Sequence, residues 1–194
     1  MQDFWFYIQL GLHHVLDFSA YDHILFLSAL AIPFTFKRWK KVLILATVFT
    51  VTHCLSLALA TFDILIFDIS LIEFLIPVTI FLTAVFNLIY VNSEIQQKNV
   101  VLHLIATAFF GLIHGFGFSN YFKMLMAEEE DKVTPLLGFA TGIELSQLLI
   151  IISILLVAFF VQSVGRVKQS LYIIIASILI LIITIPMLIN TYPF

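Results

Sequence analysis

The sequence of 194 residues has little charge and almost no cysteine: charged residues make up 11% of it, and Cys54 is its single cysteine. A soluble domain carries about 25% charged residues, so this chain has too little charge to cover a water-facing surface. One cysteine excludes a disulfide framework and a cysteine-rich metal cluster. No basic stretch precedes the first apolar run, so we expect no removable signal peptide.

What the chain has instead is apolar: 62% of its residues are hydrophobic, and its mean hydropathy is +1.12. This composition excludes a soluble globular protein, a disordered tail and a nucleic-acid binder. A helix needs about 20 apolar residues to cross a bilayer, and backbone polar groups in lipid must be satisfied internally. We therefore predict an all-α, polytopic membrane helix bundle forming a single domain over residues 1–194. Its six apolar runs are residues 4–36, 42–60, 71–90, 100–118, 135–161 and 171–189.

The first run is too long for one membrane helix, because 33 residues would extend for roughly 50 Å. Its middle is also polar, from His13 to His23. We expect an interfacial or half-inserted helix over about residues 3–17, a break near residues 18–20, and a spanning helix to about residue 36. Irregular backbone at membrane depth is tolerated beside protein or a water-filled cavity, so the break predicts a site.

Basic residues fall on alternate connections between the runs. Seven of the nine lie in the first, third and fifth connections: Lys37, Arg38, Lys40, Lys41, Lys98, Arg166 and Lys168. The positive-inside rule puts these connections in the cytoplasm. We therefore predict an integral protein of a bacterial-type inner or plasma membrane, with both termini outside.

Ionisable residues lie within or at the edges of the apolar runs, where together they cost on the order of 10 kcal/mol of insertion free energy. Such groups persist when they pair, line a cavity or bind an ion, and we predict that eight of them bind a metal: His14, Asp17, Asp22, His23, His53, Glu73, His114 and Glu144. We expect four polar residues to support these ligands: Thr50, Ser56, Asn87 and Gln147. We interpret His103 as an interfacial residue and the surplus of 21 phenylalanines as lipid-facing bulk.

Imidazole and carboxylate ligands suit Ni²⁺, Co²⁺, Zn²⁺, Mn²⁺ or Fe²⁺ better than Cu⁺. His14 and Asp17 are three residues apart and could hold one ion on a helical turn. Asp22 and His23 are adjacent and would point about 100° apart on a regular helix. They can serve one site if the backbone bends, or if the carboxylate orients the imidazole.

Two small-xxx-small pairs, Gly111 with Gly115 and Gly138 with Gly142, predict close approach of helix backbones. The first pair, together with Gly117, surrounds His114. This cluster of glycines could thin helix 100–118 or break it beside that histidine.

Five stretches, taken in order, resemble motifs of the HupE/UreJ family: residues 11–27, 49–57, 73–87, 110–118 and 138–147. This family comprises small membrane proteins named as accessory to nickel hydrogenase and urease and regarded as nickel or cobalt permeases. The chain differs from the family's usual His-x5-Asp-His spacing, since seven residues separate His14 from Asp22. The spacing leaves open whether His14 shares a site with Asp22 and His23.

The resemblance implies a nickel- or cobalt-type permease, whereas the residues alone imply a polar, metal-binding centre in the bundle. The same cluster would also suit a membrane-embedded zinc hydrolase, although the sequence contains no HExxH motif. A third hypothesis is a non-transporting assembly factor or metal sensor. We expect the lipid bilayer and a metal ion (Ni, Co or Zn) as partners, leave a homo-oligomer open, and expect no nucleic acid.

Overall fold

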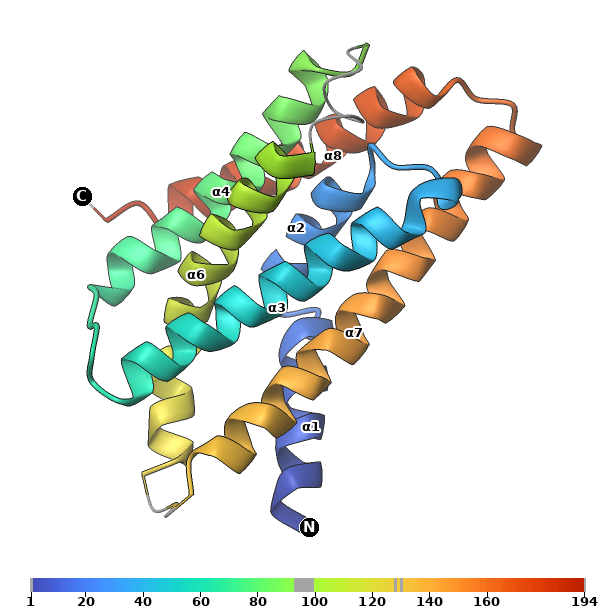
Figure 1. Ribbon diagram of the computed structural model, residues 1–194. Helices are drawn as coiled ribbons and strands as arrows, with labels where there is room; N and C mark the ends of the chain where they lie inside the picture. The colour runs from blue at the N-terminus through green and yellow to red at the C-terminus, as the bar shows by residue number, and fades with distance from the viewer. Residues whose placement is uncertain (1, 93–99, 128, 130, 194) are drawn as a thin grey trace.

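The computed structural model describes residues 2–92, 100–127, 129 and 131–193, and this part of the chain is helical without strands. Its helices are α1 (Gln2–Leu16), α2 (Asp22–Ala31), α3 (Trp39–Thr61), α4 (Ile69–Ile89), α6 (Val100–Leu125), α7 (Val133–Phe159) and α8 (Gln169–Asn190). A 3-10 turn, Phe36–Arg38, precedes α3, and a π turn, Phe160–Val164, follows α7. The long helices run obliquely alongside one another as a bundle (Figure 1). The predicted all-α bundle is therefore confirmed.

Four helical segments in the described part are long and apolar enough to cross a membrane: Phe36–Thr61, Ile69–Ile89, Val133–Val164 and Gln169–Asn190. The chain is thus an integral membrane protein. The count of six membrane spans stays a prediction. The expectation that residues 1–194 form a single domain also stays a prediction.

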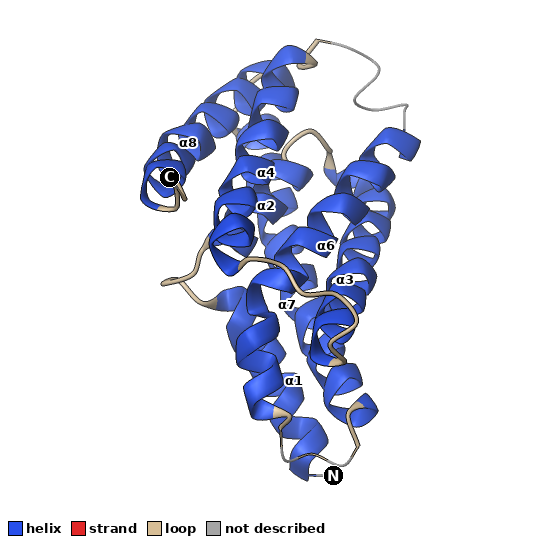
Figure 2. Cartoon of the chain, turned by 90° about the vertical axis from the view of Figure 1, so that its left-hand side faces the viewer, coloured by secondary structure: helices blue, strands red, loops and turns tan. Residues whose placement is uncertain are grey.

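The first apolar run is broken where the sequence predicts. Helix α1 ends at Leu16 and α2 begins at Asp22, and Figure 2 shows the two in succession along the bundle with the irregular segment between them. The Asp17 carboxylate accepts a hydrogen bond of 2.7 Å from the backbone N–H of Ser19, and so gives a partner to one backbone group in the break.

The predicted continuation of the second half to residue 36 is wrong, because α2 ends at Ala31. Its 10 residues extend for about 15 Å, half the thickness of the hydrocarbon core. Pro33 lies just beyond the end and cannot continue a helix. Helix α2 is therefore a half-helix whose N-terminus lies deep in the bundle.

Glycines bring the helix backbones together at two interfaces. A Cβ on Gly115 of α6 would lie 2.2 Å from the carbonyl oxygen of His53 on α3, and a Cβ on Gly142 of α7 would lie 2.1 Å from that of Ile8 on α1. Both predicted small-xxx-small pairs therefore lie at close helix–helix contacts. Helix α6 runs unbroken through its glycines, so they allow close packing without interrupting the helix.

The interpretation of the phenylalanines as lipid-facing bulk is wrong for an inner group. Phe26, Phe49, Phe122 and Phe139 are fully buried, and Phe49 packs against Phe26 with ring centroids 5.0 Å apart. Histidine rings in the core pack against these phenylalanine rings. Composition alone does not reveal this packing.

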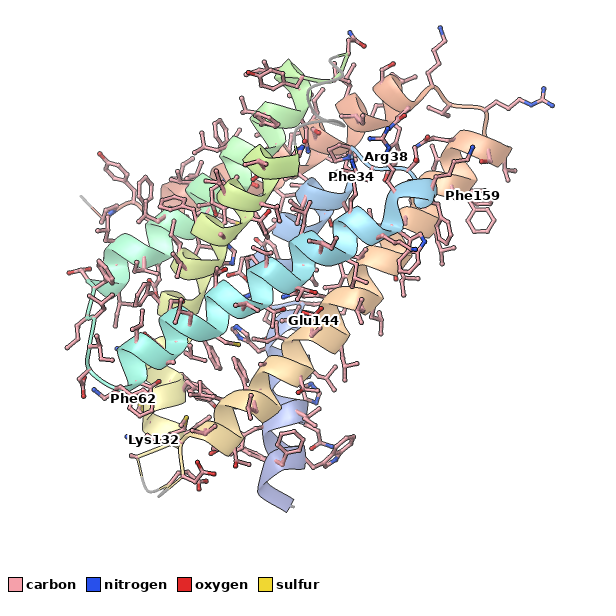
Figure 3. All side chains as sticks on the ribbon, in the orientation of Figure 1. Phe34, Arg38, Phe62, Lys132, Glu144 and Phe159 are labelled. Atoms are coloured by element: carbon pink, nitrogen blue, oxygen red, sulfur yellow. The ribbon has the colours of Figure 1, made fainter. Side chains whose placement is uncertain are left out.

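The two ends of the bundle differ in charge. In Figure 3, Arg38 marks one end of the bundle and Lys132 marks the opposite end, with Glu144 between them. The connections that contain Lys37 and Arg166 share the first end, while those that contain Asp63 and Asp131 share the second, as do both chain ends (Figure 1). Asp131 accepts hydrogen bonds from Thr134 and from the N–H of Val133, which lower the pKa of its carboxyl group. The connections that carry most of the basic residues thus share one end of the bundle, and the connections rich in acidic residues share the other. The orientation of the termini across the membrane stays a prediction.

Candidate metal centre

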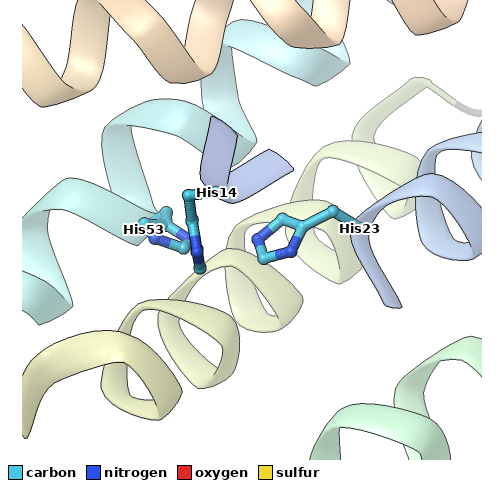
Figure 4. Close-up of side chains that lie close together, drawn as sticks. All are labelled: His14, His23 and His53. Atoms are coloured by element: carbon cyan, nitrogen blue, oxygen red, sulfur yellow. The ribbon is translucent and has the colours of Figure 1, made fainter. Parts of the chain in front are cut away.

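Four histidines from four different helices meet inside the bundle. His14 lies in the last turn of α1, His23 is the second residue of α2, His53 lies in the second half of α3, and His114 lies in α6. The ring centroid of His23 is 4.7 Å from that of His14, 5.6 Å from that of His53 and 5.2 Å from that of His114. Figure 4 shows His14, His23 and His53 gathered around a common point. We call these four residues and Asp22 the histidine cluster.

The cluster lies in the protein interior, since His53, His114 and His23 are at most 2% exposed. Five of its ring nitrogens are buried without a hydrogen-bond partner in the described structure: Nε2 of His14, Nε2 of His23, both nitrogens of His53 and Nδ1 of His114. A buried unpaired polar atom costs about 1–3 kcal/mol. A neutral imidazole has one nitrogen lone pair, so the four histidines could offer up to four lone pairs to a cation.

Two neighbours set which nitrogens are available. Asp22 Oδ1 lies 3.0 Å from His23 Nδ1 and accepts a hydrogen bond from its N–H, which leaves the lone pair of Nε2 free. The Thr79 hydroxyl donates to the carbonyl of Ile76 at 2.7 Å. Its oxygen can therefore accept a hydrogen bond from the Nε2–H of His114, 3.4 Å away, which leaves the lone pair of His114 Nδ1 free.

The ligand atoms form two overlapping groups: His14, His23 and His53; and Asp22, His23 and His114. Within each group the atoms lie within 4.8 Å of one another. Two nitrogens bound to one ion at about 2.1 Å lie at most about 4.2 Å apart, so small side-chain rotations suffice. The donor set of neutral imidazoles and one carboxylate fits a divalent transition metal. Despite the unusual spacing, the geometry thus brings His14 together with His23 in one group, while Asp22 belongs to the other group and is joined to the first through His23.

Three of the eight predicted ligands belong to neither group. Asp17 is exposed because α1 ends one residue before it, so it does not share a helical turn with His14. Glu73 is exposed on α4. Glu144 lies between α7 and α3, where it accepts hydrogen bonds from Thr47 at 2.7 Å and Thr50 at 2.6 Å.

The four residues expected to support the ligands have different partners. Thr50 donates to Glu144. Ser56 donates to the carbonyl of His53 at 2.9 Å. Asn87 donates to the carbonyl of Ala29 at 2.7 Å and so joins α4 to α2. Gln147 is fully buried, and the described structure gives neither of its amide atoms a partner. These hydrogen bonds of Thr50, Ser56 and Asn87 thus join helices or satisfy backbone carbonyls, and none of the three is made to an imidazole of the cluster.

Sequence reasoning missed the residues that enclose the cluster. The ring of Phe118 packs against that of His14 at a tilt of 38°, with centroids 3.9 Å apart, and the ring centroid of Phe49 lies 5.3 Å from that of His114. Thr79 on α4 was also missed. Its four-residue spacing with Thr83 and Asn87 marks one face of α4 and could have revealed it.

A cavity of about 240 Å³ opens beside the break between α1 and α2. Asp22 and Glu73 supply its carboxylates, and residues 19–21 of the break line it. Asp22 therefore belongs both to this cavity and to the histidine cluster. We call the cavity the acidic vestibule, after the two carboxylates that line it.

The position of Glu144 leads to a prediction that separates a ligand from a structural carboxylate. Glu144→Gln keeps an oxygen for one threonine, and we expect it to change the Kd for Ni²⁺ by less than about threefold, because the side chain bonds Thr47 and Thr50. Isothermal titration calorimetry on the detergent-solubilised protein measures this. A loss of 10-fold or more would show that Glu144 is a ligand after all.

A family model described as "HupE / UreJ protein" matches residues 1–191, nearly the whole chain. Among curated proteins and among solved structures, none matches.

Proposed function

Since the chain belongs to the HupE/UreJ family, which supports a role in handling nickel or cobalt, we propose that it is a membrane permease for a divalent ion of this type. The observation that carries the proposal is the meeting of four histidines from four helices, with five unpartnered ring nitrogens. In this proposal the metal ion is the transported substrate.

The ligand chemistry supports nickel or cobalt as the substrate. Imidazole nitrogens bind these ions in preference to Mg²⁺ or Ca²⁺, which take oxygen ligands. Asp22 adds a carboxylate beside His23, which raises the basicity of the imidazole and compensates part of the ion's charge. The binding of an ion here offsets the free-energy cost of removing these polar groups from water.

The acidic vestibule supports a route into the cluster. Its two carboxylates, Glu73 and Asp22, attract a cation, and Asp22 is close enough to His23 for the ion to pass from oxygen to nitrogen ligands. The vestibule lies at the break in the first apolar run, where irregular backbone borders a cavity. Under the charge rule this side of the bundle is the outer one, which fits uptake.

A zinc hydrolase draws less support from the same geometry. Hydrolysis needs a carboxylate that is free to act as general base beside a metal-bound water. The carboxylate within the two ligand groups is that of Asp22, and it is bonded to Nδ1 and to the backbone N–H of His23. Aromatic rings of Phe118 and Phe49 also occupy the space next to the imidazoles.

The test is uptake of Ni²⁺ into proteoliposomes that contain a metal-sensitive dye, with protein-free liposomes as the baseline. We expect saturable influx for the wild type and loss of at least 90% of it for His14→Ala. His13→Ala is the matched control, since His13 is the neighbouring residue on α1 but is exposed, and its influx is expected to match the wild type. Tight stoichiometric metal binding without influx would overturn the permease.

A further inference from the structure

A second cavity lies on the far side of the histidine cluster from the acidic vestibule. It has a volume of about 170 Å³ between α2, α4 and α6, and Asn87, His103 and Thr107 contribute polar groups to its wall. Pro33 also lines it, which places it toward the end of the bundle that carries Lys37 and Arg38. We call it the inner cavity.

One buried hydroxyl in the inner cavity is unsatisfied. Thr107 is 1% exposed, and its Oγ1 has no hydrogen-bond partner in the described structure. A buried hydroxyl without a partner is costly, and here it lines a space large enough for several water molecules. The rest of the wall is mostly apolar, so a hydrated occupant would be held by this hydroxyl together with Asn87 and His103.

Two helices carry polar groups from the histidine cluster to the inner cavity. On α6, Thr107 precedes His114 by seven residues, two turns or about 10 Å along the helix. On α4, Asn87 follows Thr79, which contacts His114, by eight residues or about 12 Å. The cavity thus contains polar side chains of both helices beyond the cluster.

Two phenylalanine rings separate the regions. Phe26 is fully buried, its ring centroid lies 5.3 Å from that of His114 and 5.6 Å from that of Phe110, and Phe110 lines the inner cavity. An ion leaving His114 for Thr107 would have to pass these rings. Apolar rings at a constriction hold back a hydrated ion until they rotate.

We propose that the inner cavity is a second binding station for the transported divalent cation, which it holds in partly hydrated form, and that Phe26 and Phe110 form the gate between the two stations. This inference rests on the proposed permease function. The amide oxygen of Asn87, the hydroxyl of Thr107 and the imidazole of His103 are fewer and weaker ligands than those of the histidine cluster. A weaker station on the basic side allows the ion to leave.

The first experiment separates transport through the inner cavity from binding at the cluster. Ala106→Leu fills the cavity, because Ala106 lines it. We expect at least a 10-fold fall in Ni²⁺ influx, with the Kd of the histidine cluster unchanged within about twofold. Ile105→Phe is the matched control, since the neighbouring Ile105 is 64% exposed on the outside of α6, and it is expected to transport normally. Normal influx through Ala106→Leu would overturn the inference while leaving the permease intact.

The second experiment does not depend on influx. With Cys54 replaced by alanine, Ala106→Cys is expected to react with a membrane-impermeant methanethiosulfonate reagent from the side of the basic connections only. Millimolar Ni²⁺ is expected to protect it, and Thr107→Val to weaken that protection several-fold. Phe110→Ala should open reaction from the opposite side as well. A thiol that does not react, or that reacts without protection by Ni²⁺, would overturn the second station even if the wild type transports.

Discussion

Replacing His23 by alanine is expected to weaken the binding of Ni²⁺ by at least 100-fold, about 2.7 kcal/mol. His23 belongs to both groups of ligand atoms, and its ring adjoins those of His14, His53 and His114. Its removal also leaves the Asp22 carboxylate without its imidazole partner in a partly buried position. Equilibrium dialysis with metal analysis of the purified protein measures the loss.

The exposed His13 again supplies the control for this prediction, and His13→Ala is expected to bind Ni²⁺ as the wild type does. Circular dichroism and gel filtration establish that His23→Ala remains folded. If the folded variant retained the wild-type affinity, the histidine cluster would not be the site at which the ion binds.

Adding one methyl group at Gly115 is expected to destabilise the protein by at least about 2 kcal/mol. A Cβ there would lie 2.2 Å from the His53 carbonyl oxygen and 2.1 Å from Ser56 Oγ, so α3 and α6 would have to separate. That movement would draw His53 away from His114 and should also weaken metal binding. The unfolding temperature in detergent, followed by tryptophan fluorescence, measures the change in stability.

Gly117→Ala is the control on the same helix, because its Cβ would meet the end of the Ile76 side chain at 2.8 Å, which can rotate away. We expect it to lower stability much less than Gly115→Ala does. Equal effects of the two variants would mean that the backbone contact beside His53 is not what limits this position.

The histidines show how much of a buried site can be predicted from the sequence. His14, His23, His53 and His114 could be selected from the sequence because ionisable groups in apolar helices are costly and need a common reason to be there. Asp17, Glu73 and Glu144 met the same criterion and yet do not join the cluster. Cost identifies residues that need partners, but Glu144 finds its partners in two threonines.

The sequence by itself determined that this is a helical membrane protein with a broken first segment, close glycine contacts and charges of opposite sign at its two ends. These properties follow from local composition and spacing, which decide whether a segment can leave water and form a helix. Only the tertiary structure decided that His14 and His23 face each other across the break and that phenylalanines enclose them. The reason is physical: the direction of α2 after the irregular segment is set by packing against α4 and α7, and no spacing along the chain encodes the relative placement of helices.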